Sequence, residues 1–306
     1  MRMILLTVIT CFMIEAAPRP LQRVAFSSDE VVTVDVDRVN LQFSVRNRKG
    51  KLITNLKREH FNIFEDDQLQ SITNFSTETD LPLNIALLFD SSGSLHDKLR
   101  FEQDAAAQFL YSSLRRGRDQ ALIMTFDTTI SLLHDYTDDP AILVAAMQKI
   151  ILGGSTSLYD AVCEAATEKL ARQAERRVIV IISDGMDNTS HVSLAKTIEL
   201  VQKSDVVVYA VSTNRFGTSI SPEQKMGDEV LTQLATETGG QALFPARVED
   251  LVHCFARISE DLRSQYSLAY RPTNARRDGT YRQIRIVTPN NRHTVRSRSG
   301  YFAPGP

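Results

Sequence analysis

The spacing of hydrophobic residues differs between the flanks and the middle of this chain. Between residues 31 and 45, apolar residues occupy alternate positions, which is typical of a β-strand with one buried face. About four short strands are expected within residues 28–78, and further strands are expected at 266–270, 281–288 and 294–301. A sheet as small as either group is marginal on its own. We therefore expect the two groups to pair and form one β-sandwich.

The middle of the chain has a different pattern, which begins at Leu83. Continuous apolar runs, typical of strands buried on both faces, alternate with segments of helical spacing. The predicted strands cover residues 84–89, 121–126, 130–133, 178–182, 206–211 and 242–244. The predicted helices cover residues 99–110, 140–150, 158–171, 194–202, 230–238 and 248–263. This alternation predicts an α/β domain with a doubly wound, mainly parallel sheet, inserted in the small all-β sandwich.

The N-terminus has the features of a secretory signal peptide. Arg2 is followed by a mostly apolar stretch from Ile4 to Ile14, and small residues follow at Ala16 and Ala17. The stretch is too short for a stable transmembrane helix, and no other run of 18 apolar residues occurs. We expect residues 1–17 to be removed, the mature chain to have no transmembrane span, and the protein to be secreted or located in the periplasm or cell envelope.

The patterns divide the chain into four parts. The expected parts are a signal peptide at 1–17, the N-terminal part of the sandwich at 28–80, the α/β domain at 82–263 and the C-terminal part of the sandwich at 264–304. Cys163 and Cys254 would remain in the mature chain, as buried free thiols or as one disulfide.

Composition excludes several classes of function. The 306 residues include 42% hydrophobic and 24% charged residues, an ordinary globular balance, and the net charge of -2 argues against a nucleic-acid partner. Three cysteines are too few for a disulfide scaffold or a Cys-rich zinc module. Residues 264–306 are locally basic, with eight arginines and one acidic residue, Asp278. They could form a basic docking patch, but their alternate spacing favours the solvated face of edge strands.

Polar side chains gather at one edge of the predicted sheet. Asp90, Ser92 and Ser94 follow the first strand of the α/β domain, and Asp184 follows the fourth. In the common strand order 3-2-1-4-5-6, these two strands flank the crevice at which ligands bind. The segment Gly-Gly-Ser-Thr-Ser at 153–157 leads to the same edge. All of these groups are hard oxygen donors, which suit Mg²⁺, Mn²⁺ or Ca²⁺ better than zinc or copper.

At these residues the chain resembles the von Willebrand factor type A domain. That family has an Asp-x-Ser-x-Ser segment, a Thr in a middle loop and an Asp after the fourth strand. The matching residues are Asp90, Ser92, Ser94, Thr156 and Asp184. The resemblance implies a metal-ion-dependent adhesion site at these five residues. The flanks, including Ser299-Gly300-Tyr301, also resemble the acidobacterial-type subgroup of secreted proteins related to this family.

The resemblance implies a binding module rather than an enzyme. A divalent cation, Mg²⁺ or alternatively Mn²⁺ or Ca²⁺, would bridge the chain to a carboxylate of a protein partner or surface ligand. One alternative is a structural subunit of a cell-envelope assembly that uses the β-sandwich as its interface. A metal-dependent hydrolase is less favoured, because such enzymes usually assemble more carboxylates or histidines. The nearby Asp127 and Asp187 are explained by hydrogen bonding or helix capping.

Overall fold

The computed structural model describes residues 38–77, 81–93, 99–173, 176–214 and 221–305. The predicted signal peptide, residues 31–37 of the first alternating segment, and Ser94 lie outside the described residues. Residues 37–306 form one compact unit. In the described part of the chain, no helix combines the length and the apolar character needed to cross a bilayer.

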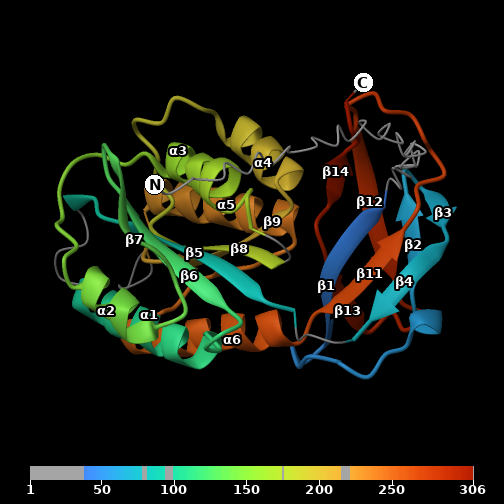
Figure 1. The fold of residues 1–306 in the computed structure, drawn as a ribbon, viewed down its shortest axis with the longest axis horizontal. Coiled ribbons are helices and arrows are strands. Elements are labelled where there is room, and N and C mark those ends of the chain that lie inside the picture. Colours follow the sequence, from blue (N-terminus) through green and yellow to red (C-terminus); the bar gives the residue numbers. More distant parts are fainter. Residues whose placement is uncertain (1–37, 78–80, 94–98, 174–175, 215–220, 306) are drawn as a thin grey trace, which may run out of the picture. The chain divides into compact units, whose positions relative to one another are not determined.

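The centre of the fold is a six-stranded sheet with the order β10-β9-β8-β5-β6-β7 (Figure 1). Its strands are β5 (Leu83–Asp90), β6 (Gln120–Phe126), β7 (Ile130–Thr137), β8 (Arg176–Ser183), β9 (Val206–Ser212) and β10 (Ala242–Leu243). All neighbouring pairs are parallel except β6 and β7. Counted from β5, this is the predicted order 3-2-1-4-5-6, so the doubly wound, mainly parallel sheet is confirmed.

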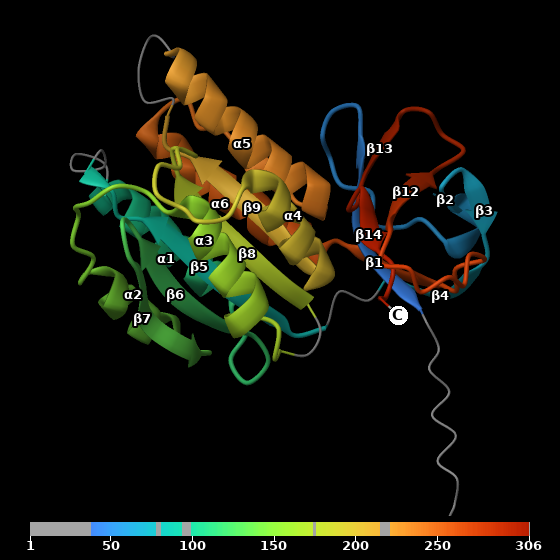
Figure 2. The ribbon, with the colours of Figure 1, turned by 90° about the horizontal axis from the view of Figure 1, so that it is seen from above.

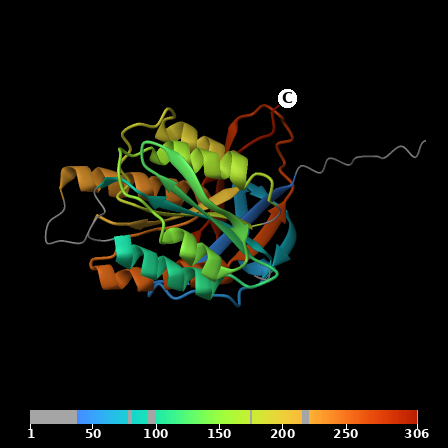
Figure 3. The same ribbon diagram turned by 60° about the vertical axis from the view of Figure 1, so that its left-hand side comes forward.

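Helices cover both faces of this sheet. They are α1 (Leu99–Ser113), α2 (Pro140–Met147), α3 (Leu158–Glu164), α4 (Leu194–Lys203), α5 (Pro222–Thr238) and α6 (Leu251–Arg263). One buried core includes α1, α2 and α6, which lie on one face (Figure 3), and a second includes α3, α4 and α5 on the other (Figure 2). Burial on both faces explains why every residue of β5 is buried.

The remaining strands form two four-stranded sheets with a shared aromatic core. Their orders are β13-β1-β11-β4 and β14-β12-β2-β3. The N-terminal strands are β1 (Val39–Asn47), β2 (Asn62–Glu65), β3 (Gln68–Gln70) and β4 (Ile72–Ser76), and the C-terminal strands are β11 (Tyr266–Tyr270), β12 (Tyr281–Val287), β13 (His293–Arg296) and β14 (Gly300–Phe302). Each sheet combines strands from both ends of the chain, which confirms that the two β segments pair. Phe43, Phe61 and Tyr266 pack together inside the sandwich.

Several element boundaries differ from the sequence predictions. The helix expected at 230–238 begins earlier, at Pro222, where Ser221 and Gln224 form a capping box. The helix expected at 158–171 ends its α-helical part at Glu164 and continues as a π-helical turn, Ala165–Lys169. The last helix begins with a 3₁₀ turn, Val248–Asp250; another short 3₁₀ turn, Arg58–His60, precedes β2.

The single strand expected at 294–301 is wrong, because this segment forms two strands in different sheets. β13 pairs with β1, whereas β14 pairs with β12. Gly300 begins the second strand, and a Cβ there would lie 2.3 Å from the carbonyl oxygen of Arg282. The close approach of these two backbones, which only glycine permits, brings the chain into the second sheet.

A buried carboxylate joins α6 to the sandwich. Asp261 is 1% exposed and accepts hydrogen bonds from Arg46 Nη2 at 2.8 Å, Tyr209 Oη at 2.7 Å and Arg296 Nη1 at 3.1 Å. Arg46 belongs to β1 and Arg296 to β13, while Tyr209 belongs to β9. One side chain therefore ties the final helix to both the central sheet and the sandwich.

Candidate functional site

The candidate site lies at the carboxyl ends of β5 and β8, which are parallel neighbours. Asp90 is the last residue of β5, and Asp184 directly follows β8. Ser183 Oγ donates to Asp90 Oδ2 at 2.7 Å, so the ends of the two strands are joined through the Asp90 carboxylate. The other oxygen, Asp90 Oδ1, accepts from the backbone N–H of Ser92 at 2.9 Å. The carboxyl ends of β5 and β8 therefore lie side by side, as the sequence predicts, with Asp90 on one and Asp184 directly after the other.

Burial makes Asp90 electrostatically unusual. The residue is 0% exposed, and burial raises the pKa of its carboxyl to about 6, although hydrogen bonds from Ser183 and Ser92 oppose this rise. The negative charge of Asp184 raises the Asp90 pKa further. Neither carboxylate forms an ion pair with a described basic residue. A buried anion beside a second carboxylate, with no described basic side chain to offset it, is the environment that a bound metal ion would neutralise.

The middle loop is held against this edge by hydrogen bonds to three neighbouring loops. Gly153 N–H donates to the carbonyl of Ser91 at 2.8 Å. Ser155 N–H donates to Thr128 Oγ1 at 2.9 Å. Asn188 N–H donates to the carbonyl of Thr156 at 2.8 Å. The structure therefore brings together the loops that carry Asp90, Thr156 and Asp184, and Thr156 is buried there with 4% exposure.

The backbone at Asp184 is fixed by α5. Gly185 has a φ of 79°, and a Cβ there would lie 2.2 Å from the carbonyl oxygen of Gly227 in α5. Asn214 Nδ2 donates to the carbonyl of Asp184 at 2.7 Å and to Asp228 Oδ1 at 3.0 Å. These contacts set the direction in which the chain leaves β8.

The two other carboxylates singled out in the sequence stabilise the surrounding loops. Asp187 Oδ1 accepts from Tyr159 N–H at 3.1 Å and from Ser190 Oγ at 2.6 Å, at the start of α3. Asp127 Oδ1 accepts from Thr129 N–H at 2.7 Å. Hydrogen bonding therefore explains both residues, as expected.

Sequence reasoning missed Ser183, whose hydroxyl donates to Asp90 and accepts from Gly185 N–H at 3.0 Å. Its position at the end of β8, directly opposite the end of β5, was the available signal.

The donor set fits a hard divalent cation. Carboxylate and hydroxyl oxygens predominate at this edge, and no group of three or more His, Cys, Asp or Glu side chains in the described ranges is arranged to hold a metal ion. The predicted set would combine two carboxylates with three hydroxyls, and one of these, from Ser94, lies outside the described residues. A hollow of about 290 Å³, lined in part by Ser91, Asp127 and Lys149, adjoins the loops of the site.

Comparisons with known proteins agree with this fold. Residues 85–186 match the family model described as the von Willebrand factor type A domain, and this range includes all five predicted ligands. None of the curated proteins matches the chain. The matched range and the observed fold support a von Willebrand factor type A domain within this protein.

Solved structures with a similar fold include proximal thread matrix protein 1 from the mussel byssus. The identity is 17%, the match covers 65% of this chain and 51% of the mussel chain, and the TM-score is 0.52. A second structure of that protein, described as having a zinc-occupied MIDAS motif, has 18% identity, covers 65% and 49% of the two chains, and has a TM-score of 0.52. This chain thus spans about half the length of the mussel protein, and at such low identity the likeness shows the fold alone.

Proposed function

We propose that this protein is an exported, metal-dependent binding or adhesion module without catalytic activity. Asp90, Ser92, Ser94, Thr156 and Asp184 would hold a divalent cation, Mg²⁺ or alternatively Mn²⁺ or Ca²⁺. The observation that carries this proposal is the buried Asp90 carboxylate, which lies beside Asp184 and has no basic partner among the described residues. The zinc-occupied MIDAS motif of the mussel protein supports a divalent ion in this fold.

Each side chain would have a distinct task at the site. The two carboxylates supply negative charge, and the hydroxyls of Ser92, Ser94 and Thr156 supply neutral oxygens. When bound, the cation would supply an electrophilic position that attracts a carboxylate oxygen of the partner. Ser183 and Ser92 hold Asp90 in place by donating to its two oxygens. The binding energy would therefore depend on residues that are positioned before the partner arrives.

We further propose the division of the chain expected from its patterns, with the α/β domain at 82–263 between the two parts of the sandwich at 28–80 and 264–304. Export to the cell surface or periplasm, as the signal-like N-terminus predicts, would place the site where surface ligands are available. A resident envelope partner that presents Asp or Glu side chains fits this placement.

A pull-down from the envelope fraction of the source organism tests the proposal. The purified protein is immobilised and incubated with the fraction in Mg²⁺ or in excess chelator. The expected result is a retained partner in Mg²⁺ only, lost in Asp90→Ala and weakened in Thr156→Ala. Asp104→Ala removes an exposed carboxylate of α1 and serves as the matched control.

The role of the partner's carboxylate is tested in the same assay. Amidation of carboxyl groups in the envelope fraction should abolish capture, whereas acetylation of its amines should not. Capture that persists unchanged in excess chelator would contradict the metal-dependent module and favour the structural subunit that binds through its β-sandwich.

A further inference from the structure

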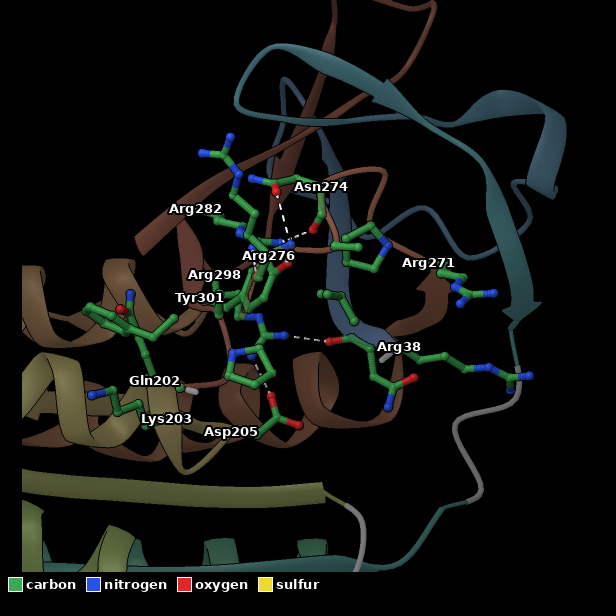
Figure 4. Close-up of a pocket in the computed structure, with 18 residues that line it drawn as sticks. Arg38, Gln202, Lys203, Asp205, Arg271, Asn274, Arg276, Arg282, Arg298 and Tyr301 are labelled. Atoms are coloured by element: carbon green, nitrogen blue, oxygen red, sulfur yellow. Dashed lines mark hydrogen bonds and ion pairs between the residues drawn. The ribbon is translucent and has the colours of Figure 1, made fainter. Parts of the chain in front are cut away.

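A second pocket lies away from the candidate metal site. Figure 4 shows the residues that line it. The volume of the pocket is about 610 Å³, within the range typical of small-molecule sites. It is lined by the start of β1, the end of α4, the loop between β11 and β12, and the chain from Tyr301 to Gly305. Asp205, which lines it, directly precedes β9, whereas the metal-site loops follow the ends of the parallel strands. The pocket therefore lies at the amino ends of the parallel strands, and the metal site lies at their carboxyl ends.

The lining is strongly basic. Six cationic side chains contribute to it: Arg38, Lys203, Arg271, Arg276, Arg282 and Arg298. Asp205 is the one acidic residue in the described lining, and its carboxylate is bound by Arg298 Nη1 at 2.8 Å. Lys203 donates to Glu199 at 2.7 Å. Arg282 pairs with Glu65 at 3.5 Å and with Asp278 at 4.0 Å. Three of the six cationic side chains are therefore paired, and the pocket retains the positive charge of the other three.

Two of the arginines are built into the wall. The Arg282 side chain is 3% exposed and donates to the carbonyl of Asn274 at 2.5 Å and to the carbonyl of Arg276, so it holds the loop that forms one side of the pocket. The alternate spacing of the arginines predicted that they lie on a solvated strand face. This prediction is wrong for Arg282, which is buried. Arg298 donates to Asp205 (Figure 4) and to the carbonyl of Asn40. The Nε atoms of Arg282 and Arg298 are both buried and have no hydrogen-bond partner among the residues that the structure describes.

Three further arginines are free to bind a ligand. Arg38, Arg271 and Arg276 are exposed, and their guanidinium groups form no ion pair within the described ranges. In Figure 4, Arg38 and Arg271 lie on one side of the pocket, opposite Gln202 and Lys203. Several like charges around one hollow repel each other, and an anion between them would remove that repulsion. Apolar surfaces of Tyr301, Phe302 and Pro304 complete the lining.

We propose that this pocket binds a small organic or inorganic polyanion with two or more phosphate or carboxylate groups. Guanidinium groups bind these oxyanions in a planar, bidentate manner, which lysine cannot reproduce. The walls supplied by Arg282 and Arg298 are pre-formed, and the exposed arginines close on the ligand from the mouth. The pocket shares no residue with the metal site, so this proposal does not rest on the metal-dependent function.

Calorimetric titration with inorganic tripolyphosphate, in buffer without added divalent metal, tests this proposal. The full chain should bind one tripolyphosphate, and the double variant Arg271→Ala/Arg276→Ala should weaken binding at least tenfold. Both arginines are exposed and form no ion pair in the described part of the chain, so the fold should remain intact. Citrate titrated in parallel identifies the preferred chemistry, phosphate or carboxylate.

A matched double variant controls for overall charge. Arg48→Ala/Arg292→Ala removes two exposed arginines at the other end of β1, near the pair formed by Asn47 and His293. This variant and Asp90→Ala should bind tripolyphosphate as the parent does. Absence of binding to the parent, or equal weakening in the two double variants, would overturn the proposal. Loss of binding in Asp90→Ala would also overturn it, because the anion would then depend on the metal site.

Discussion

Substitution of Asp261 by Asn should destabilise the protein strongly without changing the shape of the side chain. Asp261 is 1% exposed, and it accepts from Arg46, Tyr209 and Arg296. The Arg46 and Arg296 side chains are 11% and 21% exposed, so water can solvate their positive charges only in part. Asparagine would leave two largely buried guanidinium groups without their counter-charge, and removal of one partner from a buried pair costs about 3–5 kcal/mol.

We expect a cost at the lower end of this range of about 3–5 kcal/mol, because the side-chain oxygen of the substituted asparagine can still accept the hydrogen bond from Tyr209. A loss of about 3 kcal/mol corresponds to a fall in Tm of roughly 5 °C for a protein of this size. The chain has no tryptophan, so urea unfolding is best followed by far-ultraviolet circular dichroism. The free energy of unfolding should fall, while its dependence on urea concentration stays the same.

Glu260→Gln is the matched control, since it removes a carboxylate from the exposed neighbouring position of α6. Its effect should stay within about 0.5 kcal/mol of the parent. An Asp261→Asn protein as stable as this control would refute the argument that Asp261 ties α6 to the sandwich.

Two further predictions concern the interior of the α/β part. Burial would raise the pKa of Asp119, but hydrogen bonds from Arg115, Arg263 and backbone N–H groups hold it well below its usual range. Its ionised form therefore stabilises the fold above the unfolded carboxyl pKa of about 3.9, and this contribution is lost as the pH falls toward the lower folded pKa. Urea unfolding should accordingly show that Asp119→Asn is most destabilising above about pH 5 and less so at pH 3; a pH-independent difference would contradict this. Gly185→Ala should destabilise more than Gly117→Ala in thermal unfolding, because both positions have positive φ but only the Gly185 Cβ would overlap backbone atoms; equal effects would contradict the packing argument.

The arrangement of the candidate site was largely predictable from the sequence. The apolar runs of β5 and β8 are long enough to identify buried strands, and the rule for doubly wound sheets places their carboxyl ends together. Asp90 and Asp184 follow from that rule. The hydrogen bond from Ser183 to Asp90 did not, because it depends on the registration of two strands 93 residues apart in the chain.

The errors have physical causes in particular residues. The first turns of α5 are polar, so hydrophobic spacing did not show them, although Ser221 and Pro222 are strong helix-start signals. The break between β13 and β14 leaves the alternating pattern intact, and only the approach of Gly300 to Arg282 reveals it. Arg282 itself is buried with Glu65, a partner 217 residues away that local spacing cannot identify.

The central claim is that a divalent cation binds at the site that includes Asp90. Calorimetric titration of the metal-free protein with Mn²⁺ or Mg²⁺ tests it most directly. The parent and the Asp104→Ala control should each bind one ion. Asp90→Ala, which removes the buried carboxylate at the end of β5, should bind none while it retains the parent's circular dichroism spectrum. Equal metal binding by Asp90→Ala and the parent would contradict the account of a metal-dependent module at this site.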